Sequence, residues 1–302
     1  MPPETIRILT WNLFHGRDGL PGLGPTRRST WLRRPEEDGV HVHLNRKLTG
    51  HMAARIRAWA PDVCALQEVS RRGVREVARL TGMAAVWAAT GPLIGPAWLR
   101  DALAERNPDL WRTHESNVNA LLVAPRLTLV PGTRRAVRLN PPRTILRDAR
   151  ELRLTRGELA RWIPEPRRVV LARVRLPGGG ELVAGSVHCH NARHPDVTGR
   201  EIGRAAAAVL AAAGGGPALM AGDLNAPPSH PALAALAAGG WEGAAPDGGI
   251  GIDRIVHHGL ETVEAPHRLD AGAREVGVAW GGRARRLRLS DHDPVVAVLR
   301  AI

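Results

Sequence analysis

The sequence predicts an α+β fold in which β-strands and helices share one domain. Short apolar runs bounded by turn residues recur along the chain and indicate buried strands. Between them, apolar residues repeat at helical spacing, as in Leu48, Met52, Ile56 and Trp59. The chain has 302 residues, 44% of them hydrophobic, which is enough for a sizeable core. Because no linker divides the chain, we expect a single domain over residues 1–302.

The elements follow in order from these patterns. The first strand is expected over about Thr5–Trp11, followed by a Gly/Pro-rich surface loop over Gly16–Gly39. Residues 47–59 predict an amphipathic helix. Further strands are expected over Val63–Leu66, Val118–Val123, Leu127–Val130, Val170–Leu176 and Glu181–Val187, and near Leu219, Ile255 and Val296; further helices are expected over Val74–Leu80 and Asp196–Ala213. Proline and glycine interrupt residues 87–117, so this segment, like 16–50, resembles an insertion of unassigned role.

The charge of the chain has two interpretations. The formal net charge is +13, which favours an anionic partner such as nucleic acid. However, Lys47 is the only lysine among 42 basic residues and tyrosine is absent, a bias typical of a GC-rich coding sequence. The densest basic stretch, Arg134–Arg175, is either a solvated face of helix and loop or a surface that tracks phosphates.

Cysteine usage and the first residues bear on location. Cys64 and Cys189 lie in apolar contexts and are expected to be core thiols, not a disulfide. The N-terminus has no charged and apolar regions of a signal peptide, and no apolar run is long enough to cross a bilayer. We therefore expect a cytoplasmic monomer without a membrane span.

Polar side chains stand at the ends of six apolar runs. These motifs are Trp11-Asn12, Gln67-Glu68, His188, Gly222-Asp223-Leu224-Asn225, Asp253 and Ser290-Asp291-His292-Asp293. Acids, amides and imidazoles at strand ends can converge at one edge of a sheet and hold a metal there. The sequence therefore predicts a polar site built from six strand ends.

The chemistry of these residue types suggests roles. Glu68 is the first candidate ligand for a hard cation such as Mg²⁺, and Asn12 offers an amide oxygen to the metal or an NH₂ group to a phosphate. Asp223 lies two residues from Asn225, which in an extended segment places both side chains on one face. Asp253 and His292 form a candidate acid–imidazole dyad, in which the carboxylate fixes the tautomer of the ring.

The ordered motifs resemble the endonuclease/exonuclease/phosphatase superfamily, the deoxyribonuclease I-like fold. The matching blocks are Thr10-Trp11-Asn12-Leu13, Leu66-Gln67-Glu68-Val69, Asn119-Ala120-Leu121-Leu122, Val187-His188, Gly222-Asp223-Leu224-Asn225, Ile252-Asp253-Arg254-Ile255 and Ser290-Asp291-His292-Asp293-Pro294-Val295. The resemblance implies a four-layer α/β/β/α sandwich, in which two packed mixed β-sheets are flanked by helices.

The resemblance also implies roles for individual residues. It makes Asp223 the residue that orients or deprotonates the attacking water, while Asn225 steadies the water and the phosphate. His188 would contact the scissile phosphate and Asn119 would lie near it. Asp291 is expected to lie in an extended strand and to point the opposite way from His292, and the resemblance makes it a metal or nucleophile-site ligand. Many family members place a tyrosine in the cleft, and its absence here argues against assignment to abasic-site repair.

The function expected is divalent-metal-dependent hydrolysis of a phosphoester. Mg²⁺ or Mn²⁺ on Glu68, with Asn12 and Asp291, would polarise the phosphoryl group for in-line attack by water. DNA or RNA is the first substrate expected, with endonuclease or exonuclease action. A phosphomonoesterase acting on inositol or lipid phosphates is the alternative, and a non-catalytic binding module of the same fold is a third, which the complete polar set disfavours. Whether Asp223 or the dyad supplies the base, and whether one metal or two bind, stays open.

Overall fold

The structure is a computed structural model of the chain. It describes residues 4–18, 36–37, 39–44, 46–91, 95–96, 98–100, 102, 117–192, 194–244 and 251–301. Most of the expected surface loop over 16–39, and much of the segment 87–117, lie outside the described residues.

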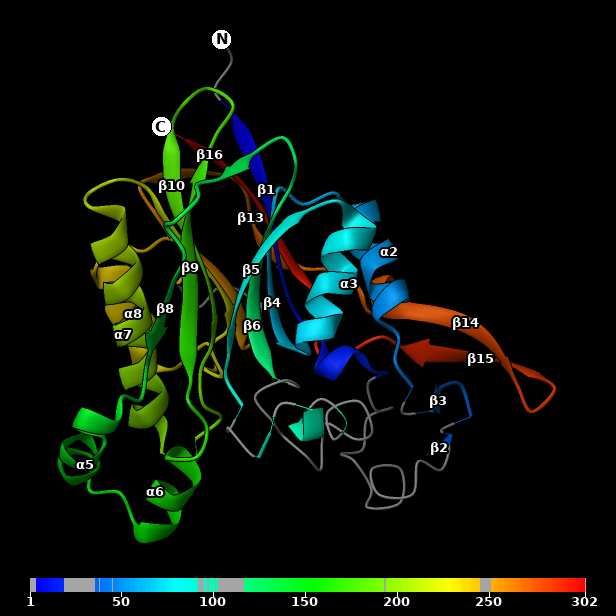
Figure 1. Cartoon of the computed structure of the whole chain (residues 1–302), viewed down its shortest axis with the longest axis horizontal. Coiled ribbons are helices and arrows are strands. Elements are labelled where there is room, and N and C mark those ends of the chain that lie inside the picture. Colours follow the sequence, from blue (N-terminus) through cyan, green and yellow to red (C-terminus); the bar gives the residue numbers. More distant parts are fainter. Residues whose placement is uncertain are drawn as a thin grey trace.

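Two six-stranded sheets form the centre of the molecule (Figure 1). The first has the order β13 (Leu260–Arg268), β16 (Val295–Ala301), β1 (Thr5–Asn12), β4 (Val63–Val69), β6 (Val118–Val123) and β5 (Ala84–Ala89). The second has the order β12 (Asp253–His258), β11 (Ala218–Asp223), β10 (Glu181–His188), β9 (Arg168–Arg175) and β7 (Thr128–Leu129), and β8 (Arg135–Arg138) also pairs with β9. Each sheet mixes parallel and antiparallel pairs, so both are mixed sheets.

Helices cover the outer face of each sheet (Figure 1). They are α2 (Thr49–Trp59) and α3 (Arg71–Thr81) on the first sheet, and α7 (Pro195–Ala213) and α8 (Pro231–Ala238) on the second. Helices α5 (Pro142–Glu151) and α6 (Arg156–Trp162) form an excursion between β8 and β9. The remaining elements are η1 (Phe14–Gly16), β2 (Glu36–Glu37), β3 (Val42–His43), η2 (Ala271–Arg274), β14 (Glu275–Trp280) and β15 (Arg283–Arg288). The predicted four-layer α/β/β/α sandwich is confirmed.

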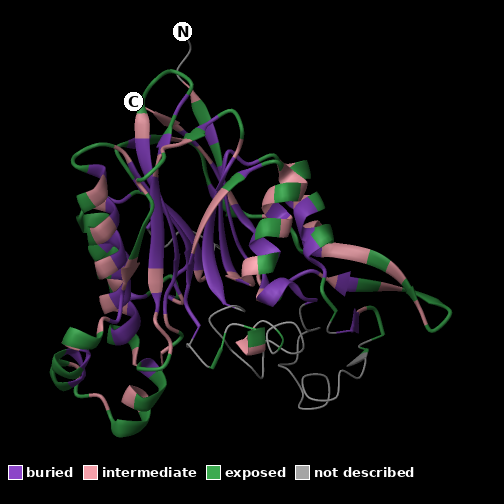
Figure 2. Ribbon diagram, in the orientation of Figure 1, coloured by how far each residue is buried: buried purple, intermediate pink, exposed green. Residues whose placement is uncertain are grey.

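Side-chain alternation along the strands builds three core layers. In β1, Ile6 and Ile8 point into the core between the sheets, whereas Leu9 and Trp11 point to the layer beneath α2 and α3. A third layer lies between the second sheet and α7 with α8. Figure 2 shows the resulting buried strands between exposed helix faces. Because successive strand residues face opposite sides, a strand buried on both sides must be apolar throughout, as these runs are.

The strands and helices predicted from strong patterns are present, with shifts of one to a few residues at their ends. Several elements were not predicted. Strand β5 is rich in alanine, which favours helices, and its pairing with β6 overrides that preference. Strand β13 is largely exposed and its register shifts twice, so its pattern is weak. Cys64 and Cys189 are free and buried, as predicted. None of the helices in the described part of the chain combines the length and apolar character that a membrane crossing requires.

Candidate active site

The topology of the first sheet brings three of the polar motifs to one edge. Strands β1 and β4 are parallel, so Asn12 and Glu68 leave the sheet at the same end. Strand β16 is antiparallel to β1 and therefore begins at that end, directly after residues 290–293. Motifs more than 200 residues apart in the sequence are neighbours for this reason.

The second sheet contributes the other three motifs in the same way. Strands β10 and β11 are parallel, with His188 opposite Asp223. Strand β12 is antiparallel to β11 and begins with Asp253, opposite Asp223. Gly222 has φ 155°, and a Cβ atom there would overlap the carbonyl oxygen of Val187, so only glycine permits this approach of β11 to β10.

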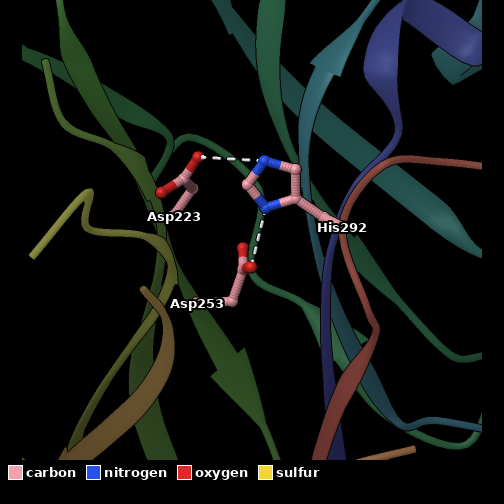
Figure 3. A group of neighbouring side chains, drawn as sticks. All are labelled: Asp223, Asp253 and His292. Carbon is pink, nitrogen blue, oxygen red and sulfur yellow. Dashed lines mark hydrogen bonds and ion pairs between the residues drawn. The ribbon is translucent and has the colours of Figure 1, made fainter. Parts of the chain in front are cut away.

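Asp223, Asp253 and His292 meet where the two sheets face each other (Figure 3). His292 Nδ1 lies 2.7 Å from Asp253 Oδ2, and His292 Nε2 lies 3.9 Å from Asp223 Oδ2. Burial alone would lower the pKa of His292, but the hydrogen bond to Asp253 and the charges of Asp253 and Asp223 outweigh it and raise the pKa to about 10. The contact expected for the dyad is therefore present, and its catalytic role stays a prediction.

Asp223 contacts residues of both sheets. Its Oδ2 accepts a hydrogen bond of 3.2 Å from Asn12 Nδ2 and lies 3.5 Å from His188 Nε2. Burial, with the nearby Asp253 carboxylate, raises the pKa of Asp223 to about 7, against the opposing effect of His292. The carboxyl group is only 2% exposed, so its partners fix its position.

Glu68 leaves β4 through an irregular backbone. The pairing of β4 with β6 shifts register between Leu66 and Val69, and Glu68 has φ 47°, a left-handed conformation uncommon for this residue type. Glu68 Oε1 lies 3.8 Å from His188 Nε2, and Glu68 Oε2 lies 3.6 Å from His15 Nε2. The bulge thus turns the carboxylate toward the second sheet and toward η1.

The remaining predicted residues occupy distinct places. The Asn225 backbone N–H donates to Asp223 Oδ1 at 2.9 Å, and Asn225 Nδ2 donates to the carbonyl of Cys189 at 2.9 Å. Asn119 is fully buried in β6; its Nδ2 donates to the carbonyl of Arg168, and its Oδ1 has no hydrogen-bond partner among the described residues. Asn12 Oδ1 accepts the backbone N–H of Phe14 at 3.1 Å.

The expectation that Asp291 sits in an extended strand was wrong. Asp291 and His292 form a bend, and β16 begins only at Val295. The cause is a set of hydrogen bonds that hold this loop to β1. Ser290 Oγ donates to the carbonyl of Asn12 at 2.6 Å and accepts the His292 N–H at 3.1 Å.

Two further residues clamp the loop of residues 290–293. Trp11 Nε1 donates to the carbonyl of His292 at 3.0 Å. Arg274, buried in η2, donates from Nη1 to the carbonyl of Ser290 at 2.6 Å, and its Nε lies 2.8 Å from Asp293 Oδ1. Since Asp291 and His292 lie between these anchors, the clamp fixes the backbone that carries both.

Sequence reasoning missed a buried polar layer beneath the site. Gln67 is fully buried, accepts from Thr10 Oγ1 at 3.3 Å and donates from Nε2 to Ser186 Oγ at 3.2 Å, linking the sheets. His15 was also missed, although it contacts Glu68. The sequence did contain a signal for Gln67. A polar side chain that points inward from an apolar strand needs a buried hydrogen-bond partner, so its position predicts a buried polar contact.

The donor set fits a hard divalent cation. Glu68, Asp291 and Asn12 carry the carboxylate and amide oxygens that Mg²⁺ prefers, and their role as metal ligands stays a prediction. Among the described residues, Asp223, Asp253 and His292 also form a group of potential metal ligands, whose ligand atoms all lie within 4.8 Å of one another. Burial raises the pKa of Asp291; His292 opposes this effect and the Glu68 carboxylate adds to it. The excess of acidic groups at this edge is what a bound cation would neutralise.

Comparisons with known proteins identify the family. The family model described as the endonuclease/exonuclease/phosphatase family matches residues 9–292. The chain belongs to this family. Members of the family are generally phosphoester hydrolases that use a divalent metal. No curated protein matches the sequence significantly.

Solved structures of family members share the fold at low sequence identity. A family protein from Bacteroides thetaiotaomicron superposes with a TM-score of 0.64 at 13% identity, over 100% of both chains. A mannosyl-6-phosphatase from the same organism gives 0.62 at 12%, over 97% of this chain and 99% of the other. The catalytic domain of human Nocturnin with bound sulfate gives 0.62 at 14%, over 98% and 94%. At these identities the likeness shows the fold alone.

Proposed function

We propose that the protein is a metal-dependent phosphoester hydrolase whose reaction takes place where Asp223, Asp253 and His292 meet. The observation that carries this proposal is the position of Asp223 between the two sheets, in contact with Asn12 and His188 and close to the Asp253–His292 pair. Glu68, Asn12 and Asp291 would hold a Mg²⁺ or Mn²⁺ ion. When bound, such an ion would polarise the phosphoryl group and neutralise its developing charge.

Residues of the chain carry out the remaining steps, which are proton transfer and stabilisation of charge. Asp223 orients a water molecule and accepts its proton, while Asn225 hydrogen-bonds Asp223 through its backbone and steadies the water and the phosphate. Water attacks the phosphorus in line with the leaving oxygen. His292, held by Asp253, is protonated and stabilises the phosphoryl oxygens. His188 reaches the same oxygens. Either His188 or His292 donates the proton that the leaving oxygen requires.

Nucleic acid is the first proposed substrate. The exposed surface of α5 presents Arg143, Arg147 and Arg150 at helical spacing, and Arg153 follows the helix. These arginines belong to the excursion that contains α5 and α6 (Figure 1). The excursion rejoins the second sheet at the start of β9, where Val169 pairs with Val187, so it lies at the same end of the sheet as His188. Exposed guanidinium groups in a row can follow a phosphate backbone.

A phosphomonoester is the second candidate substrate. The observation that favours it is a small cavity lined by α6 and by residues of the loop after β10, beginning with His190, two residues after His188. One similar structure, the Bacteroides protein, is described as a mannosyl-6-phosphatase.

The test is hydrolysis of a panel containing plasmid DNA, RNA, bis-p-nitrophenyl phosphate and inositol phosphates, each with Mg²⁺, with Mn²⁺ and with chelator. We expect turnover of at least one substrate with metal and its loss with chelator. A folded protein that hydrolyses none of them with either metal would reject the proposal. Cleavage of the polymers alone would favour the nuclease, and cleavage of inositol phosphates alone the phosphomonoesterase.

A further inference from the structure

A cavity of about 270 Å³ is lined in part by the chain segment that follows His188 of the candidate active site. One wall is α6, and the other is formed by His190, Asn191, Ala192 and His194, between β10 and α7. His190, which lines the cavity, follows His188 by two residues, and two residues span at most about 7 Å of chain. The cavity is thus within reach of a group attached to a phosphate at His188.

Buried contacts hold the two walls together. Glu201 of α7 is fully buried; its Oε1 accepts from Trp162 Nε1 at 2.8 Å and its Oε2 accepts the backbone N–H of His190 at 2.7 Å. Asp148 of α5, also fully buried, pairs with Arg200 and Arg204 of α7 at 2.7 and 2.6 Å. The excursion is therefore fixed against α7, and the cavity has a defined shape without a ligand.

The chemistry of the lining selects a class of ligand. Arg161 donates hydrogen bonds, Glu158 accepts them and Asn191 does both, so the polar groups need a partner with donors and acceptors. The charges of Arg161 and Glu158 oppose each other, and the imidazoles of His190 and His194 add further nitrogens that donate or accept hydrogen bonds. Glu158 is held in place by the capping box of α6, where its Oε2 accepts from the N–H and hydroxyl of Thr155.

The base of the cavity argues against a stacked nucleobase. Trp162 and Val197 close the base and are 1% and 2% exposed, so no aromatic face is open for stacking. A saturated ring with several hydroxyl groups fits both surfaces. Its hydroxyls can donate hydrogen bonds to the polar lining and accept them from it, and its C–H groups can pack against the apolar base. The volume lies just below the usual range for small-molecule sites, about 300–1,000 Å³, which suits one ring rather than a whole substrate.

We infer that this cavity is the subsite for a polyhydroxylated ring carried by the substrate phosphate. The inference rests on the proposed function, because it places the phosphate at the Asp223 site. Ribose, a hexose and an inositol share this chemistry, and the test distinguishes them.

The experiment measures binding, separately from turnover. Calorimetry with Mg²⁺ compares a hexose phosphate, an inositol monophosphate and a ribonucleoside monophosphate with methyl phosphate, which lacks the ring. The protein carries Asp253→Asn to suppress hydrolysis. We expect at least one ring phosphate to bind about tenfold more tightly than methyl phosphate, the change that one or two net hydrogen bonds produce.

Substitutions locate that preference. Arg161→Met and Asn191→Ala should each reduce it to about threefold or less, whereas Arg156→Met, an exposed arginine of the same helix outside the cavity lining, should leave it intact. The inference is overturned if no ring phosphate binds more tightly than methyl phosphate, or if the preference survives both cavity substitutions. Turnover by the parent tests the proposed function independently: a ring preference without hydrolysis would retain the subsite and reject the hydrolase.

Discussion

At the scale of single residues, Asp253 and His292 have the most specific geometry. Their 2.7 Å contact fixes Nδ1 of the imidazole and leaves Nε2 directed at Asp223 (Figure 3). An imidazole held in this way presents one nitrogen to the substrate in a defined protonation state. In the proposed mechanism, the two residues act as one unit.

We expect Asp253→Asn to lose turnover on the order of 10²–10³-fold, with little change in substrate affinity, because loss of the carboxylate lowers the pKa of His292 and weakens the hold on its protonated ring. His292→Ala should be at least as damaging, and the double variant little worse than His292→Ala alone. A double-mutant cycle on turnover measures this. Additive losses would show that the two residues act separately and would make Asp253 a candidate second metal ligand.

The site residues that could be predicted from the sequence are those at the ends of strands. The motif residues could be found because an acid, amide or imidazole ends an apolar run, and the topology then brings those ends together. His15 and Ser290 could not be ranked in this way, since their importance comes from contacts across the sheet. The bend at Asp291 was missed for the same reason, because its cause is hydrogen bonding to β1.

At the scale of elements, Arg274 of η2 links the stability of the fold to the position of the site loop, residues 290–293. Arg274 is buried and contacts both Ser290 and Asp293, whereas Arg268 is half exposed and lies 3.6 Å from the same Asp293. Removing the Arg274 guanidinium would leave the buried carbonyl of Ser290 without its donor and Asp293 without its closer cation, whereas exposed ion pairs contribute little.

Arg274→Met should therefore lower the free energy of unfolding by about 3 kcal/mol, and Arg268→Met, the matched control, by less than about 1 kcal/mol. Urea denaturation measures both. Equal effects of the two substitutions would mean that Arg274 does not anchor the loop of residues 290–293.

Elements with strong periodicity, such as β10 and α7, could be predicted to within a residue or two. Strand β5 could not, because its alanines carry no strand preference and only pairing with β6 makes it a strand. The β14–β15 hairpin alternates weakly and is half exposed, so its sequence resembles a solvated loop. Whether such a segment becomes a strand depends on pairing with distant parts of the chain, and that pairing cannot be read from a single sequence.

At the scale of the whole molecule, the net charge of +13 bears on the choice of substrate. If Arg143, Arg147, Arg150 and Arg153 contact a duplex backbone, log affinity should fall with log salt by roughly 0.9 per phosphate contact. Replacing all four by methionine should flatten the slope. The measurement is fluorescence anisotropy with labelled DNA over a salt series. A parent slope near zero, with turnover of a small phosphomonoester, would move the assignment to the phosphatase.

The central claim is that Glu68 anchors a divalent cation needed for phosphoester hydrolysis. The most direct measurement is the hydrolysis rate against Mg²⁺ concentration for the parent and for Glu68→Gln, with circular dichroism to show that both are folded. We predict that the parent rate rises with Mg²⁺ and vanishes in excess chelator, and that Glu68→Gln lowers the maximal rate by roughly 10³-fold through loss of the anchoring charge. Equal rates for the two proteins, or full parent activity in excess chelator, would contradict the account.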